Sequence, residues 1–151
     1  MNAAATDSLH VVCPHCQSVN RLRQADLAQA PNCGRCKAAL FDGRPIVLDE
    51  AAFERHVGRN DIPVLVDFWA PWCGPCRQMA PAYEQAAANL EPFVRVVKLD
   101  TEQAPQLASR LVIRSIPTLA LFRHGREVAR QAGALTSPAA IVQWAQTHLD
   151  R

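Results

Sequence analysis

The most informative stretch of the 151-residue chain is Val64-Leu65-Val66-Asp67-Phe68-Trp69-Ala70-Pro71-Trp72-Cys73-Gly74-Pro75-Cys76. Its mostly apolar first half predicts a strand buried on both faces, over residues 62–69. A Cys-x-x-Cys pair follows and opens a predicted helix, where free N–H groups and the helix dipole stabilise a thiolate. Because the thiolate is the nucleophile of disulfide exchange, this stretch predicts thiol–disulfide chemistry at a strand–helix junction.

Length and composition narrow the class of protein. The chain fits one domain, or one domain with a small appendage, and its 49% hydrophobic and 20% charged residues are ordinary for a soluble globular protein. The net charge of +2 gives no reason to expect nucleic acid or a membrane surface as a partner, and no stretch reaches the roughly 18 apolar residues of a membrane span. Residues 1–7 lack the pattern of a secretory signal, so we expect a cytoplasmic protein whose cysteines serve metal binding or catalysis.

All six cysteines fall into three Cys-x-x-Cys pairs, and two of these pairs lie near the N-terminus. Sixteen residues separate Cys13/Cys16 from Cys33/Cys36, and each pair can offer two thiolates from a tight knuckle. Two such knuckles predict a closed, tetrahedral four-cysteine site for one structural Zn²⁺ per chain. Gly34 is expected to supply a positive φ within the second knuckle.

Other readings of these four cysteines are two disulfides or four free thiols, and the spacing favours zinc over both. His10 and His15 could in principle ligate a metal. With four cysteines at hand, we expect both histidines to be bystanders.

The chain divides into two parts at the turn-rich segment of residues 42–45. Residues 1–43 carry too few large apolar side chains to fold alone, so we expect them to form a four-cysteine zinc-binding domain held together by the metal. Residues 44–151 carry their own core and form the second domain. We therefore expect the two parts to separate energetically, with the second remaining folded when the metal is lost.

The second part alternates strand and helix signals in the order β-α-β-α-β-α-β-β-α. Strands are expected at 46–48, 62–69, 93–99, 118–122 and 127–131. Helices are expected at 49–58 and 105–110, after Cys73, and from Ser137 onward, with Asp49 and Ser137 as N-caps. This order predicts an α/β fold in which helices flank a central mixed sheet of parallel strands and one antiparallel hairpin.

Cys73 is expected to attack a substrate disulfide, because it lies at the helix start and should be more exposed than a residue one turn further in. Cys76 would then resolve the mixed disulfide. The alternative for this pair is half of a zinc site, which the absence of nearby ligands in the sequence disfavours.

Asp67 is a carboxylate inside an apolar strand, so its pKa should be raised by desolvation. A protonatable group there could accept the proton of Cys76 during resolution. The alternative is a solvated residue on a strand edge, and the apolar neighbours on both sides favour burial. Pro117 precedes a strand, and the general frequency of X-Pro bonds gives no reason to expect a cis bond.

Residues 46–151 resemble the thioredoxin family, most specifically in Trp72-Cys73-Gly74-Pro75-Cys76. Further matching segments are Val66-Asp67-Phe68-Trp69-Ala70, Lys98-Leu99-Asp100, Ile116-Pro117-Thr118, residues 122–125 and Gly133-Ala134. The four-cysteine extension is similar to that of bacterial thioredoxin 2, the zinc-bearing form. The resemblance implies a thioredoxin fold with a small N-terminal zinc-ribbon-like domain.

The resemblance also implies a function and a site. The chain would be a protein-disulfide reductase that takes electrons from NADPH-dependent thioredoxin reductase and passes them to disulfide-containing client proteins, maintaining thiol redox balance. Lys98 would be a neighbour of Asp67, and Pro117 would be a cis-proline. The implied substrate groove consists of Trp72, Gly74, Pro75, Ile116, Pro117 and Gly133. We expect a monomer.

Two rival functions remain open at this stage. An oxidase or isomerase could share the fold, although Gly74-Pro75 between the cysteines is similar to the reducing members of the family. A binding module that holds a partner without turnover is the rival from another class, and an intact Cys73/Cys76 pair beside Asp67 counts against it.

Overall fold

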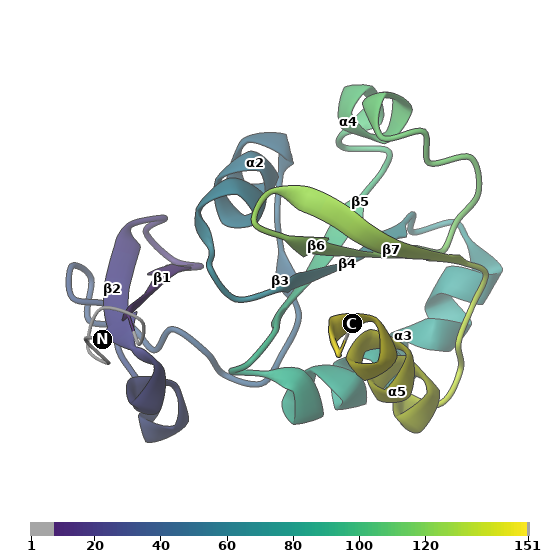
Figure 1. Ribbon diagram of the computed structural model, residues 1–151. Coiled ribbons are helices and arrows are strands. Elements are labelled where there is room, and N and C mark those ends of the chain that lie inside the picture. The colour runs from purple at the N-terminus through teal and green to yellow at the C-terminus, as the bar shows by residue number, and fades with distance from the viewer. Residues whose placement is uncertain (1–7, 151) are drawn as a thin grey trace.

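The computed structural model describes residues 8–150, whose strands form two separate sheets (Figure 1); residues 8–43 are called the N-terminal unit below, and residues 44–150 the main unit. The expectation about a leader segment in residues 1–7 lies outside the described residues. The N-terminal unit, residues 8–43, pairs β1 (Ser8–Val12) with β2 (Val19–Arg23) as an antiparallel hairpin and continues into the 3-10 helix η1 (Gln24–Gln29). The main unit, residues 44–150, is built around a five-stranded sheet.

The sheet of the main unit has the strand order β3-β5-β4-β6-β7. Its strands are β3 (Ile46–Val47), β4 (Val64–Trp69), β5 (Arg95–Asp100), β6 (Thr118–Arg123) and β7 (Arg126–Ala132). Strands β3, β5 and β4 run parallel, while β6 and β7 pair antiparallel to their neighbours. The predicted mixed sheet is therefore confirmed.

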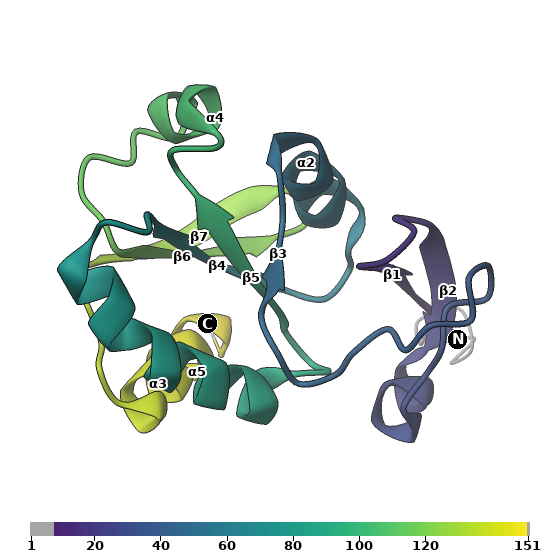
Figure 2. The ribbon, with the colours of Figure 1, turned by 180° about the vertical axis from the view of Figure 1, so that it is seen from behind.

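Helices cover both faces of this sheet. The helices α2 (Glu50–Arg59) and α4 (Pro105–Arg110) lie on one face, and α3 (Gly74–Leu90) and α5 (Pro138–Leu149) lie on the other, as Figure 1 and the reverse view in Figure 2 show. Two predicted N-caps are in place: Asp49 Oδ1 accepts from Ala52 N at 2.8 Å, and Ser137 Oγ accepts from Ala140 N at 3.0 Å.

The central strand β4 is buried on both faces, as its apolar run predicts. Alternate side chains point to opposite sides of a strand, so Val64, Val66 and Phe68 join the core under α2 and α4. Leu65 joins the other core, under α3 and α5. Asp67 has the same parity as Leu65 and therefore faces α3, the helix that carries Cys76.

Several strand boundaries differ from the prediction by one or two residues; for example, the strand expected over 62–69 begins at Val64, and the one expected over 46–48 ends at Val47. The strand expected from residue 93 begins at Arg95, because Phe93 and Val94 both donate their backbone N–H to Leu90 O, at 3.0 and 3.1 Å, in a turn that ends α3. Phe93 is exposed and adds nothing to the sheet.

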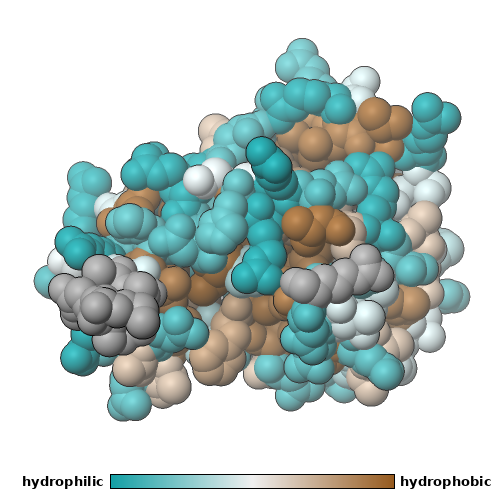
Figure 3. Space-filling model, viewed as in Figure 1, coloured by the Kyte–Doolittle hydropathy of each residue, from teal (hydrophilic) through white to brown (hydrophobic). Residues whose placement is uncertain are grey.

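The surface carries no sign of a bilayer-spanning segment in the part of the chain that the structure describes. None of its helices there combines the length and apolar character that crossing a membrane requires. On the face drawn in Figure 3, hydrophilic side chains are interspersed with small hydrophobic patches.

Candidate redox centre and metal centre

The turn between β4 and α3 presents Cys73 at the N-cap of α3. Its Sγ accepts a hydrogen bond from Cys76 N at 3.2 Å, so a backbone N–H of the first helical turn points at the sulfur. Such donors stabilise a thiolate. Cys73 and Cys76 form a disulfide with Cα atoms 5.2 Å apart, so this turn places the two sulfurs within bonding distance.

Both cysteines are buried in this disulfide form. Cys73 is 4% exposed and Cys76 is 2% exposed, so the expected difference in exposure between them is slight. The reason is that the disulfide packs against Ala70, Trp69 and Ile116 in a small cluster. What distinguishes the two is their position, at the N-cap and within the first turn of α3.

A second loop approaches the disulfide from the sheet. The carbonyl oxygen of Ile116 lies 3.8 Å from Cys73 Sγ, and the Ile116–Pro117 bond is cis, as the family resemblance implied. Gly133 N donates to Pro117 O at 2.9 Å, with Gly133 at φ 94°, where a side chain would be strained. The structure thus brings together three of the residues expected in the groove.

The exposed side of the centre is formed by Trp72, Gly74 and Pro75. Trp72 is 66% exposed, and its indole Nε1 donates to Glu102 Oε1 at 2.6 Å. Sequence reasoning missed Glu102, because it lies thirty residues further along the chain and no local pattern marks it.

Asp67 lies beneath the helix that carries Cys76. It is 1% exposed, and within residues 8–150 no hydrogen-bond partner reaches its Oδ1. Burial raises the pKa of this carboxyl to about 7, and the positive charge of Lys98 opposes that rise. The solvated alternative for Asp67 is therefore excluded, and the raised pKa that the sequence predicted is present.

Lys98 is the cross-strand partner of Asp67 on β5, as the resemblance implied. Its Nζ lies 4.2 Å from the centre of the Trp69 ring, a cation–π distance. The ammonium group thus contacts the Trp69 ring, and its charge lowers the pKa of Asp67.

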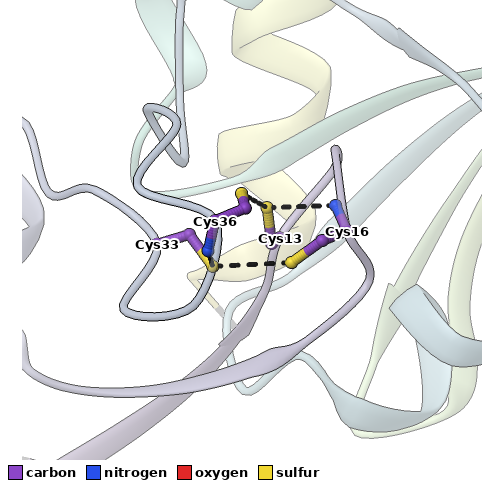
Figure 4. Close-up of side chains that lie close together, drawn as sticks. All are labelled: Cys13, Cys16, Cys33 and Cys36. Carbon is purple, nitrogen blue, oxygen red and sulfur yellow. Dashed lines mark hydrogen bonds between the residues drawn. The ribbon is translucent and has the colours of Figure 1, made fainter.

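The four N-terminal cysteines converge from two loops (Figure 4). All four Sγ atoms lie within 4.8 Å of one another, and the Cys13–Cys36 and Cys16–Cys33 sulfur pairs are each 3.6 Å apart. Four sulfurs at about 2.3 Å from a tetrahedral Zn²⁺ would be separated by about 3.8 Å, so the arrangement fits that ion. Neither His10 nor His15 belongs to the cluster.

The two knuckles have the same backbone geometry. Cys13 O accepts from Gln17 N and Cys33 O accepts from Lys37 N, each at 3.0 Å, with positive φ at Gln17 (65°) and Lys37 (68°). The expectation that Gly34 would supply the positive φ is wrong. The left-handed residue is the one after the second cysteine, and Gly34 instead donates its N–H to Asn20 Oδ1 at 2.8 Å.

The environment acts differently on the individual thiols of this cluster. The backbone N–H of Cys36 is the largest influence lowering the pKa of the Cys33 thiol to about 5. Burial raises the pKa of Cys13 to about 11.

Comparison with known protein families assigns both units. The thioredoxin family model matches residues 44–147. The chain belongs to the thioredoxin family. A second model, described as thioredoxin 2, N-terminal, matches residues 12–38, the segment that contains the four clustered cysteines.

Individual relatives agree with this assignment. Thioredoxin C-3 of Corynebacterium nephridii is 43% identical over 141 residues, which cover 93% of this chain and 96% of that protein. Thioredoxin 1 of Nostoc sp. is 49% identical over 86 residues, 57% of this chain and 80% of that protein. Among solved structures, a mutant thioredoxin from Halobacterium salinarum NRC-1 matches with a TM-score of 0.63 and 29% identity, covering 72% of this chain and 93% of that one.

Thioredoxins are thiol–disulfide oxidoreductases, and the Cys73–Cys76 disulfide occupies the active-site position of this family. The chain is therefore a protein-disulfide reductase of the thioredoxin type, with an N-terminal zinc-ribbon unit.

The burial of Asp67 yields a prediction about stability and pH. A carboxyl whose folded pKa lies above its unfolded value binds its proton more tightly in the folded state, so its destabilising effect grows as pH rises from about 4 to about 7 and is complete above that. Asp67→Asn should therefore stabilise the oxidised protein at pH 8 by up to about 4 kcal/mol, and by little at pH 4.

Urea unfolding of both proteins across this pH range measures the difference. Glu84→Gln, which removes an exposed carboxylate on α3, is the control and should show no such trend. A constant difference between Asp67→Asn and wild type from pH 4 to pH 8 would show that Asp67 is not held in a low-dielectric site.

Proposed function

We propose that the chain reduces disulfides of client proteins with Cys73 as nucleophile and Cys76 as resolving thiol. The observation that carries this assignment is the hydrogen bond from Cys76 N to Cys73 Sγ at the start of α3. It favours the thiolate at Cys73 over the thiolate at Cys76, whose sulfur lies within the helix and above a buried carboxyl.

The exchange proceeds in two steps. In the reduced chain, the Cys73 thiolate attacks one sulfur of the client disulfide, forms a mixed disulfide and releases the other client sulfur as a thiolate. The Cys76 thiolate then attacks Cys73 Sγ and releases the second client sulfur. The products are the reduced client and the Cys73–Cys76 disulfide.

Asp67 acts as the proton acceptor for Cys76. The carboxyl has a pKa of about 7, so it can hold or release a proton near neutral pH, where a general base is most effective. Lys98 positions and stabilises the ionised carboxylate, because it is the cross-strand neighbour that lowers the pKa of Asp67.

The client lies against a groove formed by Trp72, Gly74 and Pro75 on one side and by Ile116, Pro117 and Gly133 on the other. Support for this groove comes from the exposed indole of Trp72 and from the contacts that bring Ile116 O and Gly133 N around Cys73 and Pro117.

Electrons reach the chain from NADPH through thioredoxin reductase. The net reaction is the reduction of client disulfides. The chain acts as a monomer in the cytoplasm. Family membership supports the reductase as partner. Gly74-Pro75 between the cysteines supports the reducing direction over the oxidase and isomerase readings. A steady-state assay with NADPH, the reductase and a disulfide protein distinguishes a turnover enzyme from a binding module.

One Zn²⁺ per chain is held by Cys13, Cys16, Cys33 and Cys36. Four sulfur ligands leave no open position for a substrate, so the ion has a structural role. Its support is the close spacing of the four sulfurs together with the zinc-ribbon family match.

Replacing each catalytic cysteine should have a different effect. Cys73→Ser should abolish reduction, because no nucleophile remains. Cys76→Ser should accumulate covalent mixed disulfides with clients, because attack survives and release does not. Non-reducing gels and mass spectrometry after incubation with a disulfide protein measure the adducts, with the double variant as control. Adducts on Cys73→Ser but not on Cys76→Ser would reverse the assigned roles.

Metal analysis should find one zinc per chain in protein purified under reducing conditions. Cys33→Ser should lose most of this zinc, because a three-sulfur site binds far more weakly. His15→Ala, in the first knuckle, is the matched control and should retain it. Retention of full zinc by Cys33→Ser, or its loss from His15→Ala, would contradict the ligand set.

A further inference from the structure

Arg95, the first residue of β5, is fully buried although its side chain carries a charge. Its Nη2 donates to Leu40 O at 2.8 Å and to Val12 O at 3.2 Å, and both carbonyls belong to the N-terminal unit. Val12 directly precedes the zinc ligand Cys13. The guanidinium group also stacks 4.2 Å from the Phe41 ring centre. Arg95, a residue of the main unit, is thus enclosed by the N-terminal unit.

The counterion of Arg95 connects the same two units. Glu91 Oε2 lies 3.5 Å from Arg95 Nη1, with both side chains 1% exposed, and Glu91 Oε1 accepts from Gly43 N at 3.2 Å. Both members of this ion pair belong to the main unit, and the N-terminal unit covers them and supplies three of their hydrogen-bond partners, Val12 O, Leu40 O and Gly43 N. Displacing the N-terminal unit would therefore leave these two charged groups without those partners.

A second buried chain of hydrogen bonds joins α2 to the first knuckle. Asn60 Oδ1 accepts from Val12 N at 2.8 Å, and Asn60 Nδ2 lies 3.2 Å from His56 Nδ1. His56 Nε2 lies 3.0 Å from Gln17 Oε1. Burial lowers the pKa of His56 to about 3, so the ring is neutral, accepts from Asn60 and donates to Gln17.

Apolar packing follows the same boundary. Ile62 of the main unit is buried in the core of the N-terminal unit, with Val11, Cys13, Leu27, Cys33 and Leu40. That core contains two zinc ligands, so the order of the metal site and the burial of Ile62 depend on each other.

We propose that zinc binding by the N-terminal unit stabilises the whole chain. Through Arg95 and the His56–Gln17 contact, the two units unfold in one cooperative transition. Zinc occupancy therefore determines the stability of the main unit. This differs from the energetic separation expected from the sequence. It rests on the zinc binding proposed above, but not on the catalytic roles of Cys73 and Cys76.

The redox centre lies at the far end of the strands that carry this contact. Arg95 pairs with Val64 at the amino end of β4, whereas Cys73 follows the carboxyl end, about 17 Å further along at 3.3 Å per residue. Zinc loss should therefore lower the temperature at which activity is lost and leave activity in the cold largely intact.

Thermal unfolding with two probes tests the proposal on the full chain. All three tryptophans, Trp69, Trp72 and Trp144, lie in the main unit, so their fluorescence reports that unit alone. A colour-forming chelator reports zinc release. In zinc-loaded wild type, both transitions should share one midpoint. Zinc-free reduced protein should show a tryptophan midpoint lower by at least about 5 °C, which corresponds to about 1–3 kcal/mol for a chain of this size.

Two variants should weaken this coupling. Arg95→Met leaves Glu91 and two carbonyls without their partner, so the difference in midpoint between zinc-loaded and zinc-free protein should largely disappear. Gln17→Gly is the milder variant, because glycine adopts the positive φ of this position without strain, whereas His56 loses its hydrogen-bond acceptor. It should reduce the difference in midpoint between zinc-loaded and zinc-free protein without unfolding the chain. Arg44→Met, at an exposed arginine, is the control and should behave as wild type.

Metal content is measured first, so that the two proposals fail separately. A chain that binds no zinc overturns the metal site and this inference together. A chain that binds one zinc, but whose tryptophan midpoint is unchanged by its removal, or whose zinc release and tryptophan transitions separate in wild type, overturns only the coupling.

Discussion

The burial of β4 on both faces is the constraint on which the rest of the structure depends. Both faces of this strand are covered, and the chain that leaves it at Trp69 passes through a short turn into α3, which brings Cys73 to a helix start. The same burial places Asp67 under α3 with a pKa of about 7. One strand thus supplies both the position of the thiols and the proton acceptor that we propose for them, and the neighbouring strand β5 contributes Lys98.

The features that sequence reasoning predicted are those that local patterns encode. Each of these features depends on residues that lie close together in the sequence. Examples are the apolar run before Cys73, the N-caps Asp49 and Ser137, and the paired Cys-x-x-Cys knuckles. The cis bond at Pro117 was implied only by the family resemblance, since the residue pair itself favours trans.

What could not be predicted depends on contacts between distant residues. Arg95 lies 83 residues from Val12, and nothing near it in sequence shows that its charge is buried against a carbonyl of another unit. His56 lies on the face of α2 that also carries Phe53, so its burial could be expected, but its partner Gln17 could not. The prediction of a positive φ at Gly34 was wrong for a different reason. Glycine permits a positive φ, but the two knuckles adopt that conformation at Gln17 and Lys37.

The reduction potential of the Cys73/Cys76 pair tests most directly the claim that this centre reduces clients. Equilibration of the full, zinc-loaded chain with glutathione or dithiothreitol buffers, with thiol alkylation and mass spectrometry to count the oxidised fraction, gives its value. The account predicts a potential near that known for thioredoxin, about −270 mV. A value above about −180 mV, in the range of disulfide isomerases and oxidases, would contradict it.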